Sequence, residues 1–230
     1  MPVKKLPEAK LIMEHSTQNP RQAIIEAAAK CWASIPRNGM ITHLINVNHL
    51  GPFKFASFTF DLQGSRAFSH QRVRKQVGDE KLQESQRHVM YTGGFGFITP
   101  PTISDSPEAL KIYSSIMDRI QEAYTYLVDL GIPGEDARFV LPNGCFTRLR
   151  VTCSMLSLID EGKERLCSCA QWEYRGIFES IKAEVIKVDR VLGNVLQPKC
   201  KWLGYCPETV ERSCGMTPLG TPPIMSELND

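Results

Sequence analysis

The sequence lacks a long apolar run, and it lacks a strong excess of charge of either sign. The N-terminal segment has no continuous apolar core of the signal-peptide type, and no later segment approaches the roughly 18 unbroken apolar residues that a membrane helix needs. We therefore expect a cytoplasmic protein without a membrane partner. The formal net charge is +2, which disfavours a nucleic-acid polymer and requires any anion site to come from local clustering.

Internal repeats and low-complexity segments are also missing, so no repeat or disordered class is needed. What is present is ordinary for a globular protein: 230 residues, 42% of them hydrophobic and 23% charged. We expect a single domain over residues 1–196. Proline, glycine and cysteine dominate afterwards, which predicts an irregular tail over residues 197–230.

The first helix is predicted from the pair Asn19-Pro20, where asparagine caps the helix and proline takes the first helical position. Ile24, Ala28 and Cys31 would then face inward. The following turn-rich connection has little helical period, so we expect an irregular loop there.

Two segments alternate like strands, residues 54–62 and residues 145–152, and the second carries Arg148 and Arg150 on one side. The clearest helix opens at Ser106 and runs to about residue 131 on a 3.6-residue period. Further helices are predicted over residues 155–162 and 170–192, and the glycine-rich YTGGFGF segment reads as a flexible loop.

A basic, amide-rich stretch covers residues 68–91 and contains arginines, lysines, histidines and four glutamines. Forked guanidinium donors suit a phosphate, and amides can read the edge of a planar heterocycle, so a nucleotide is the expected ligand. The alternative is a solvated basic face of a helix.

The predicted local structure argues against one solvated helix. Ser65 can cap a helix in which Gln71 and Arg74 are three residues apart and share a face. Residues 78–81 form a polar turn, and residues 86–91 read as extended. Because arginine forks cost desolvation unless they find an anion, arginines on separate elements suggest one shared ligand. The four candidates are Arg74, Arg87, Arg148 and Arg175.

The order of several motifs resembles the flavin-dependent thymidylate synthases. The motifs are NPRQAIIEAAAKCW, HLGPFKFASFTF, SHQRVRKQ followed by ESQRHV, EDARFVLPNGCFTR and ERLCSCAQWEYR, over roughly residues 17–186. The resemblance implies an α/β fold with an antiparallel-rich central sheet flanked by helices. It also implies a homotetramer that methylates ring carbon five of a uridine 5′-monophosphate, with FAD as cofactor and NADPH and methylenetetrahydrofolate as co-substrates.

The resemblance implies site residues as well. The nucleotide-side set comprises Gln71, Arg74, Gln83, Ser85, Gln86, Arg87, Arg148 and Arg175, of which Ser85 and Arg175 are expected nearest the chemistry. The flavin-side set comprises Ser57, Lys75, Gln76, Arg165 and Cys169. For Arg165 alone, a solvated charge at a helix end is the competing interpretation.

The departures from the family pattern fall on the flavin side. Lys75 and Gln76 stand where the family signature has a histidine and a second arginine, and Lys54-Phe55 replaces a Glu-His pair. We therefore expect that a uridylate still binds, and that the part of the site responsible for the redox or one-carbon chemistry is altered. The product is dTMP from dUMP or a variant of that alkylation, on a ribo- or deoxyribonucleotide. The alternative is a catalytically idle or repurposed relative that binds a nucleotide as a sensor or subunit.

Cysteines add a separate expectation. Cys31, Cys145 and Cys153 have apolar surroundings, and the other five lie among polar residues. Four of these thiols could hold zinc or an iron–sulfur cluster and pin the tail, although their spacings are too long for a paired knuckle. The predicted ligands are Cys167, Cys200, Cys206 and Cys214.

Overall fold

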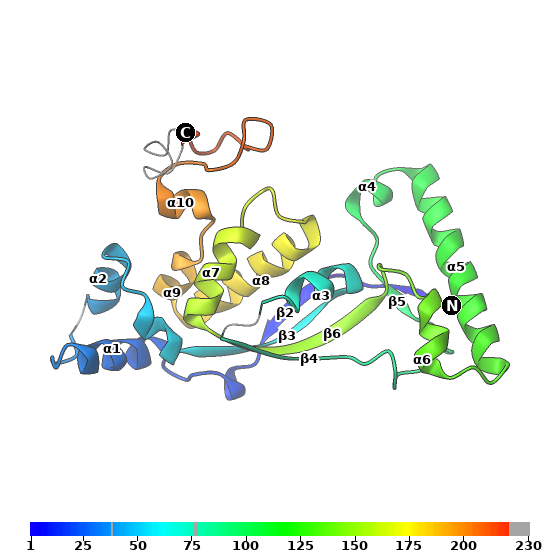
Figure 1. The fold of residues 1–230 in the computed structure, drawn as a ribbon, viewed down its shortest axis with the longest axis horizontal. Coiled ribbons are helices and arrows are strands. Elements are labelled where there is room, and N and C mark those ends of the chain that lie inside the picture. The colour runs from blue at the N-terminus through cyan, green and yellow to red at the C-terminus, as the bar shows by residue number, and fades with distance from the viewer. Residues whose placement is uncertain (38, 76–77, 221–230) are drawn as a thin grey trace, which may run out of the picture. The chain divides into compact units, whose positions relative to one another are not determined.

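The computed structural model describes residues 1–37, 39–75 and 78–220 (Figure 1). Four strands form a sheet in the order β2-β3-β6-β4, and the predicted α/β fold with an antiparallel sheet is confirmed. The strands are β2 (Glu8–Leu11), β3 (Ser57–Ser65), β4 (Asp79–Gln83) and β6 (Phe146–Ser154). None of the described helices combines the length and apolar character needed to cross a membrane.

The chain divides into two compact units. The first unit consists of Met1–Glu8, Asp61–Gln76 and Lys81–Val151. The second unit consists of Ala9–Phe60, Val77–Glu80 and Thr152–Asp230. Each unit is therefore assembled from segments that are distant in the sequence.

Helix α5 (Pro107–Asp129) is the longest element of the first unit and begins as predicted. The Ser106 side chain accepts a hydrogen bond from the Ala109 amide, and proline follows at the first helical position. Met117 and Tyr124 are buried in the core of this unit, whereas Ile116, which belongs to the same apolar period, is 46% exposed. The helix therefore buries a narrower stripe than its apolar pattern suggested.

A buried glutamine fastens the preceding loop to helix α5. The Gln121 side chain accepts a hydrogen bond from the Phe95 amide at 2.8 Å and donates one to the Tyr91 carbonyl at 2.8 Å. Next to Phe95, strand β5 (Gly96–Phe97) pairs in parallel with β1 (Val3–Lys4), so the predicted flexible loop carries a strand. The other helices of this unit are α3 (Arg66–Arg72), α4 (Pro101–Ser104), α6 (Gly134–Ala137) and η3 (Arg138–Val140).

In the second unit, helix α1 (Pro20–Cys31) has the predicted bounds. Ile24 and Ala28 are fully buried as predicted, but Cys31 at the last position is exposed. The 3-10 helix η1 (Met13–His15) precedes α1.

The loop predicted after α1 is wrong, because α2 (Met40–Asn46) and the 3-10 helix η2 (Gly51–Phe55) form there. The apolar face of α2 is too short to show a period, and Gly39 starts it from a left-handed conformation with φ of 81°. Helix η2 also shifts the start of β3 from the predicted residue 54 to Ser57.

The C-terminal helices of the second unit are α7 (Met155–Arg165), α8 (Trp172–Val188), α9 (Arg190–Val195) and α10 (Lys199–Leu203). The single helix predicted over residues 170–192 is broken at Asp189. Its backbone is extended, with φ of −151°, and its carboxylate accepts hydrogen bonds from the amides of Val191 and Leu192. This residue ends one helix and caps the next.

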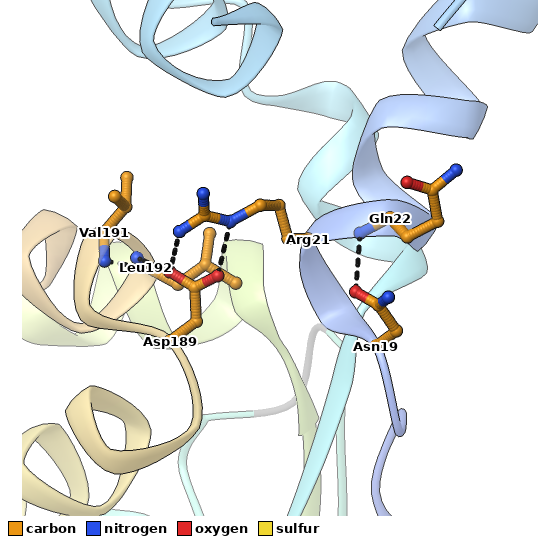
Figure 2. A network of polar contacts seen from close by, with 6 residues as sticks. All are labelled: Asn19, Arg21, Gln22, Asp189, Val191 and Leu192. Carbon is orange, nitrogen blue, oxygen red and sulfur yellow. Dashed lines mark hydrogen bonds and ion pairs between the residues drawn. The ribbon is translucent and has the colours of Figure 1, made fainter. Parts of the chain in front are cut away.

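Asp189 also ties helix α9 to helix α1 (Figure 2). The Arg21 guanidinium donates two hydrogen bonds to the Asp189 carboxylate, at 2.6 and 2.8 Å. Burial acts to raise the pKa of Asp189, but the hydrogen bonds from Arg21, Leu192 and Val191 together lower it. The carboxylate is thus held ionised in its double role.

Candidate functional site

The nucleotide-side residues of the first unit lie on or next to three elements, α3, β4 and β6. Gln83, at the end of β4, is hydrogen-bonded to the other two. Its Nε2 donates to Ser69 Oγ of α3 at 2.8 Å and to Thr147 Oγ1 of β6 at 3.1 Å. The predicted base-reading amide nitrogen is therefore engaged in holding the elements together. Its carbonyl oxygen is the part of Gln83 that remains to accept a hydrogen bond from a ligand.

Ser85 organises the turn that follows β4. Its carbonyl accepts hydrogen bonds from the His88 and Val89 amides, and its hydroxyl accepts one from the Arg87 amide at 3.3 Å. The extended segment predicted over residues 86–91 is therefore wrong in its first half. The Ser85 hydroxyl stabilises a turn by accepting a hydrogen bond from the amide two residues later. The alternation of polar and apolar residues in this short segment does not predict that turn.

This turn directs Gln86 and Arg87 to different partners. Gln86 Nε2 donates to the Cys145 thiol at 3.4 Å, and Arg87 Nε lies 2.7 Å from a Glu135 carboxylate oxygen. The side chains of Arg87 and Glu135 are 62% and 47% exposed, so this ion pair is well solvated. A guanidinium has five donors, so the pair leaves Arg87 able to bind an anion as well.

Glu84 is a functional candidate that the sequence reasoning missed. It accepts a hydrogen bond from Tyr91 Oη at 2.8 Å and one from Arg148 Nη1 at 3.0 Å. Burial, followed by the hydrogen bond to Glu84, raises the pKa of Tyr91 well above its usual value, so this phenol remains a donor. The signal was available, because Glu84 directly precedes the family-like Ser-Gln-Arg segment.

A surface hollow of about 470 Å³ lies over β3, β4 and β6 in the first unit, and we call it the strand hollow. Gln83, Glu84 and Arg148 line it together with the bidentate pair of Arg150 and Asp61, whose two hydrogen bonds are both 2.7 Å. As predicted, Arg148 and Arg150 project from the same side of β6. Arg148 and Arg150 offer N–H donors to an anion, but Glu84 and Asp61 already accept hydrogen bonds from some of them.

Helix α3 is shorter than predicted. It ends at Arg72, so Gln71 lies in its last turn and Arg74 lies beyond it. The Gln71 amide donates to the Ala67 carbonyl at 3.3 Å, and Arg74 is exposed. The two do not share one helix face, contrary to the prediction. Lys75 follows directly, and the predicted flavin-side Gln76 lies outside the described residues.

Arg165 and Arg175 lie in the second unit. The Arg165 guanidinium stacks 4.4 Å above the Tyr174 ring, and the Tyr174 hydroxyl donates to the buried Glu161 at 2.6 Å. Arg175 Nη1 donates to the Ser168 carbonyl at 2.9 Å. The stack uses the face of the Arg165 guanidinium, so its N–H donors at the edge can still bind an anionic group.

The remaining flavin-side residues of the second unit have local partners. The Ser57 hydroxyl lies 3.2 Å from Thr17 Oγ1, which also accepts a hydrogen bond from the Ser57 amide. The Cys169 thiol donates to the Arg212 carbonyl at 3.2 Å. Ser57 therefore fastens the start of β3 to the segment that precedes α1.

The second unit contains a smaller hollow of about 220 Å³, which we call the cysteine hollow. Its lining includes five of the eight cysteines together with Glu208: Cys167, Cys169, Cys200, Cys206 and Cys214. The four predicted metal ligands thus line one hollow, and Cys169, which was predicted as a flavin contact, joins them. Thiolate and carboxylate ligands within reach of one another are suited to a soft metal ion.

Eight of the predicted residues belong to the first unit, and the second unit holds four others apart from the cysteine ligands. The eight are Gln71, Arg74, Lys75, Gln83, Ser85, Gln86, Arg87 and Arg148. The four are Ser57, Arg165, Cys169 and Arg175.

The fold is that of known nucleotide methylases. The structure is similar to the crystal structure of a UMP/dUMP methylase PolB from Streptomyces cacaoi bound with 5-Br dUMP, with a TM-score of 0.74. That likeness covers 84% of this chain and 96% of the other, at 20% sequence identity. At this identity the likeness shows the fold alone.

The family is shown by sequence. The profile of the family described as thymidylate synthase complementing protein matches residues 11–189, and the chain belongs to this family. A relative from Geobacter sulfurreducens named flavin-dependent thymidylate synthase is 34% identical over 86% of this chain and 91% of its own. Another of that name from Nitratidesulfovibrio vulgaris is 33% identical over 80% of this chain and 78% of its own. The predicted membership of a flavin-dependent methyltransferase family is confirmed.

Proposed function

We propose that the protein catalyses the flavin-dependent methylation of dUMP at ring carbon five, giving dTMP. Family membership over residues 11–189 supports this reaction, as do curated relatives named flavin-dependent thymidylate synthase. One observation carries the proposal: Arg148 of β6 and Gln83 of β4 line one hollow of the first unit, and Gln83 is hydrogen-bonded to Ser69 of α3 and to Thr147 of β6. These are the donor types that recognise a pyrimidine nucleotide.

The roles follow from the contacts. Arg87 and Arg148 would bind the phosphate, because each keeps guanidinium donors that its carboxylate partner does not use. The Gln71 amide and the free carbonyl oxygen of Gln83 would read the edge of the base. Ser85 and Arg175 are proposed to act nearest the ring.

FAD is the proposed cofactor, and the donors available in the chain suit its diphosphate. Ser57, Lys75 and Arg165 would hold it, because Arg165 has edge donors left over from its stack on Tyr174. When bound, the flavin supplies hydride transfer, with NADPH as reductant and methylenetetrahydrofolate as the carbon source. The protein contributes binding, orientation and exclusion of water.

A homotetramer is proposed as the working assembly, with residues 1–196 as the catalytic domain and the remainder as a tail. A light-scattering mass near four times the 25.9 kDa chain mass is the expected result. A monomeric mass for active protein would contradict the proposed assembly.

The decisive experiment supplies FAD, NADPH, methylenetetrahydrofolate and dUMP to the purified protein and identifies the nucleotide product by mass. We expect the mass of dUMP plus one methyl group replacing hydrogen, and no such product when FAD or the folate is left out. A parallel reaction with UMP tests whether the sugar is discriminated. Arg119→Ala, an exposed arginine of α5, is the matched control for variants of the arginines assigned to the nucleotide.

The outcomes separate the two interpretations of the family resemblance. Product from dUMP supports the proposal. Protein that takes up no flavin, binds dUMP and forms no product would instead be a repurposed relative acting as a nucleotide sensor or subunit. Methylation of UMP but not dUMP would replace the proposed substrate.

A further inference from the structure

The cysteine hollow is built from parts of the chain that are distant in sequence. Cys167 and Cys169 come from the loop between α7 and α8, and Cys200 lies on α10. Cys206 and Cys214 belong to the segment that follows α10. Cys31, Cys145 and Cys153 are not among the lining residues. Five of the seven cysteines of the second unit therefore line one hollow.

The distances suit a single ion. The Sγ atoms of Cys167 and Cys169 and a carboxylate oxygen of Glu208 all lie within 4.8 Å of one another. A zinc ion bound at about 2.3 Å from each sulfur in a tetrahedral site holds its thiolates roughly 3.8 Å apart. Shifts smaller than one bond length would bring both thiols onto a common ion.

The lining of the hollow has more cations than acids. Lys163, Arg165, Lys199 and Arg212 outnumber Glu164 and Glu208, so the excess of cations would offset part of the negative charge of coordinating thiolates. Glu208 is the less favoured ligand, since the Arg212 Nε lies 3.4 Å from its carboxylate. The thiols of Cys200, Cys206 and Cys214 are the better candidates to complete the coordination.

Over residues 204–220, the segment after α10 buries little apolar surface. Its backbone folds back on itself, since the Cys206 amide donates to the Pro218 carbonyl at 2.7 Å and the Gly220 amide donates to the Cys206 carbonyl at 3.1 Å. Cys206 is buried, but Val210 and Met216 are exposed. A segment with so little apolar burial gains order from a cross-link to the helices.

We propose that the cysteine hollow is a structural zinc site. Cys167 and Cys169 supply two thiolates from the loop between α7 and α8, and the segment from Cys200 to Cys214 supplies the other two. Each coordinating thiol releases its proton to solvent as the metal binds. The Cys169 thiol is thereby assigned to the metal, and Ser57, Lys75 and Arg165 remain for the flavin. A single ion fits better than a cluster, because the thiols of Cys167 and Cys169 already lie within 4.8 Å of each other.

The test is metal analysis of the full chain purified under reducing conditions and incubated with zinc before desalting. We expect about one equivalent of zinc per chain, retained against a weak chelator. The variant with Cys167→Ser and Cys169→Ser should retain about a tenth of that zinc or less. The matched control, Cys31→Ser, alters an exposed thiol that does not line the hollow and should retain it.

A second measurement keeps the proposal testable if the double variant does not fold. Titrating the wild-type chain with a mercurial should release zinc to an indicator dye in step with the thiols consumed, because thiolates are the ligands. Zinc below about a tenth of an equivalent after reconstitution, iron with acid-labile sulfide, or disulfides among these five cysteines would each overturn the proposal. These readouts require no turnover, so their failure is distinguishable from failure of the proposed methylation.

Discussion

At the scale of single residues, carboxylates determine what the predicted arginines can do. Arg148 is paired with Glu84 and Arg87 with Glu135, and both arginine side chains are 62% exposed. A phosphate brings charge and several acceptors to the same guanidinium groups, so it can share donors with the carboxylates. The motifs were enough to select Arg87 and Arg148 as candidates. They could not predict the carboxylate partners, because these lie about 50 to 65 residues away in the sequence.

Replacing Arg87 with alanine should weaken dUMP binding by about tenfold or more, since a charge-assisted pair contributes a few kcal/mol. Calorimetric titration with dUMP measures the change, and Arg119→Ala should leave the affinity unaltered. Equal affinity in the Arg87→Ala variant and the wild type would remove Arg87 from the site.

Cys145 should make the stability of the protein sensitive to alkaline pH. Burial raises the pKa of its thiol from 9.0 to about 11, against the lowering effect of the hydrogen bond from Gln86. The unfolded thiol ionises near pH 9 and the folded one only near 11, so this contribution is intact below pH 9 and declines between the two values. The loss could reach about 2–3 kcal/mol.

Urea unfolding on both sides of pH 9 measures this decline. Cys145→Ala should reduce the loss of unfolding free energy above pH 9. The buried Tyr91 should account for the loss that remains, and Cys31→Ala should follow the wild type. A Cys145→Ala profile that parallels the wild type at every pH would exclude the thiol as a cause.

At the scale of elements, helices with caps were predictable and short or interrupted ones were not. Asn19 and Ser106 marked the starts of α1 and α5, because a side-chain cap leaves a local signature. Helix α2 has no side-chain cap, and seven residues are too few for a period. The break at Asp189 was missed although its side chain caps α9, because the apolar pattern continues from α8 into α9. Gln83 was predicted to face the nucleotide, but its bridge to Ser69 and Thr147 was not predictable, because it is a tertiary contact.

Asp189 offers a test of the junction between α8 and α9. Asp189→Ala removes a helix cap and the ion pair with Arg21, and should lower the free energy of unfolding by about 1–2 kcal/mol. Asp189→Asn keeps a good cap and should cost less. Thermal or urea unfolding of the two variants gives the comparison, and an equal loss in both would mean that the charge, not the cap, is what matters.

The same carboxylate contributes to the acid limb of stability. The pKa of Asp189 is lowered in the folded chain, so its contribution is present above the ordinary value of 3.8 and is lost as the pH falls through the folded value. Asp189→Asn should therefore show a shallower acid decline than the wild type. Superimposable acid profiles would contradict this linkage.

At the scale of the whole molecule, the motifs were sufficient for the family and the fold, because their order along the chain is shared by relatives over residues 11–189. The division into two units was not predictable. Each unit combines segments from several parts of the chain, and periodicity reports only on neighbours in sequence. Four cysteines of the cysteine hollow were predicted to lie together, but Cys169 was not among them, although it is only two residues from Cys167.

The carboxylate partners of Arg87 and Arg148 also bear on how quickly a ligand arrives. Where each guanidinium already faces an acid, the local field is largely cancelled before any anion approaches, so little long-range steering is expected. Association should then be limited by orientation and depend only weakly on ionic strength. Stopped-flow mixing with dUMP over a range of salt concentrations measures this dependence. A steep fall in the association rate with added salt would mean that Glu84 and Glu135 move away from the arginines before the ligand arrives.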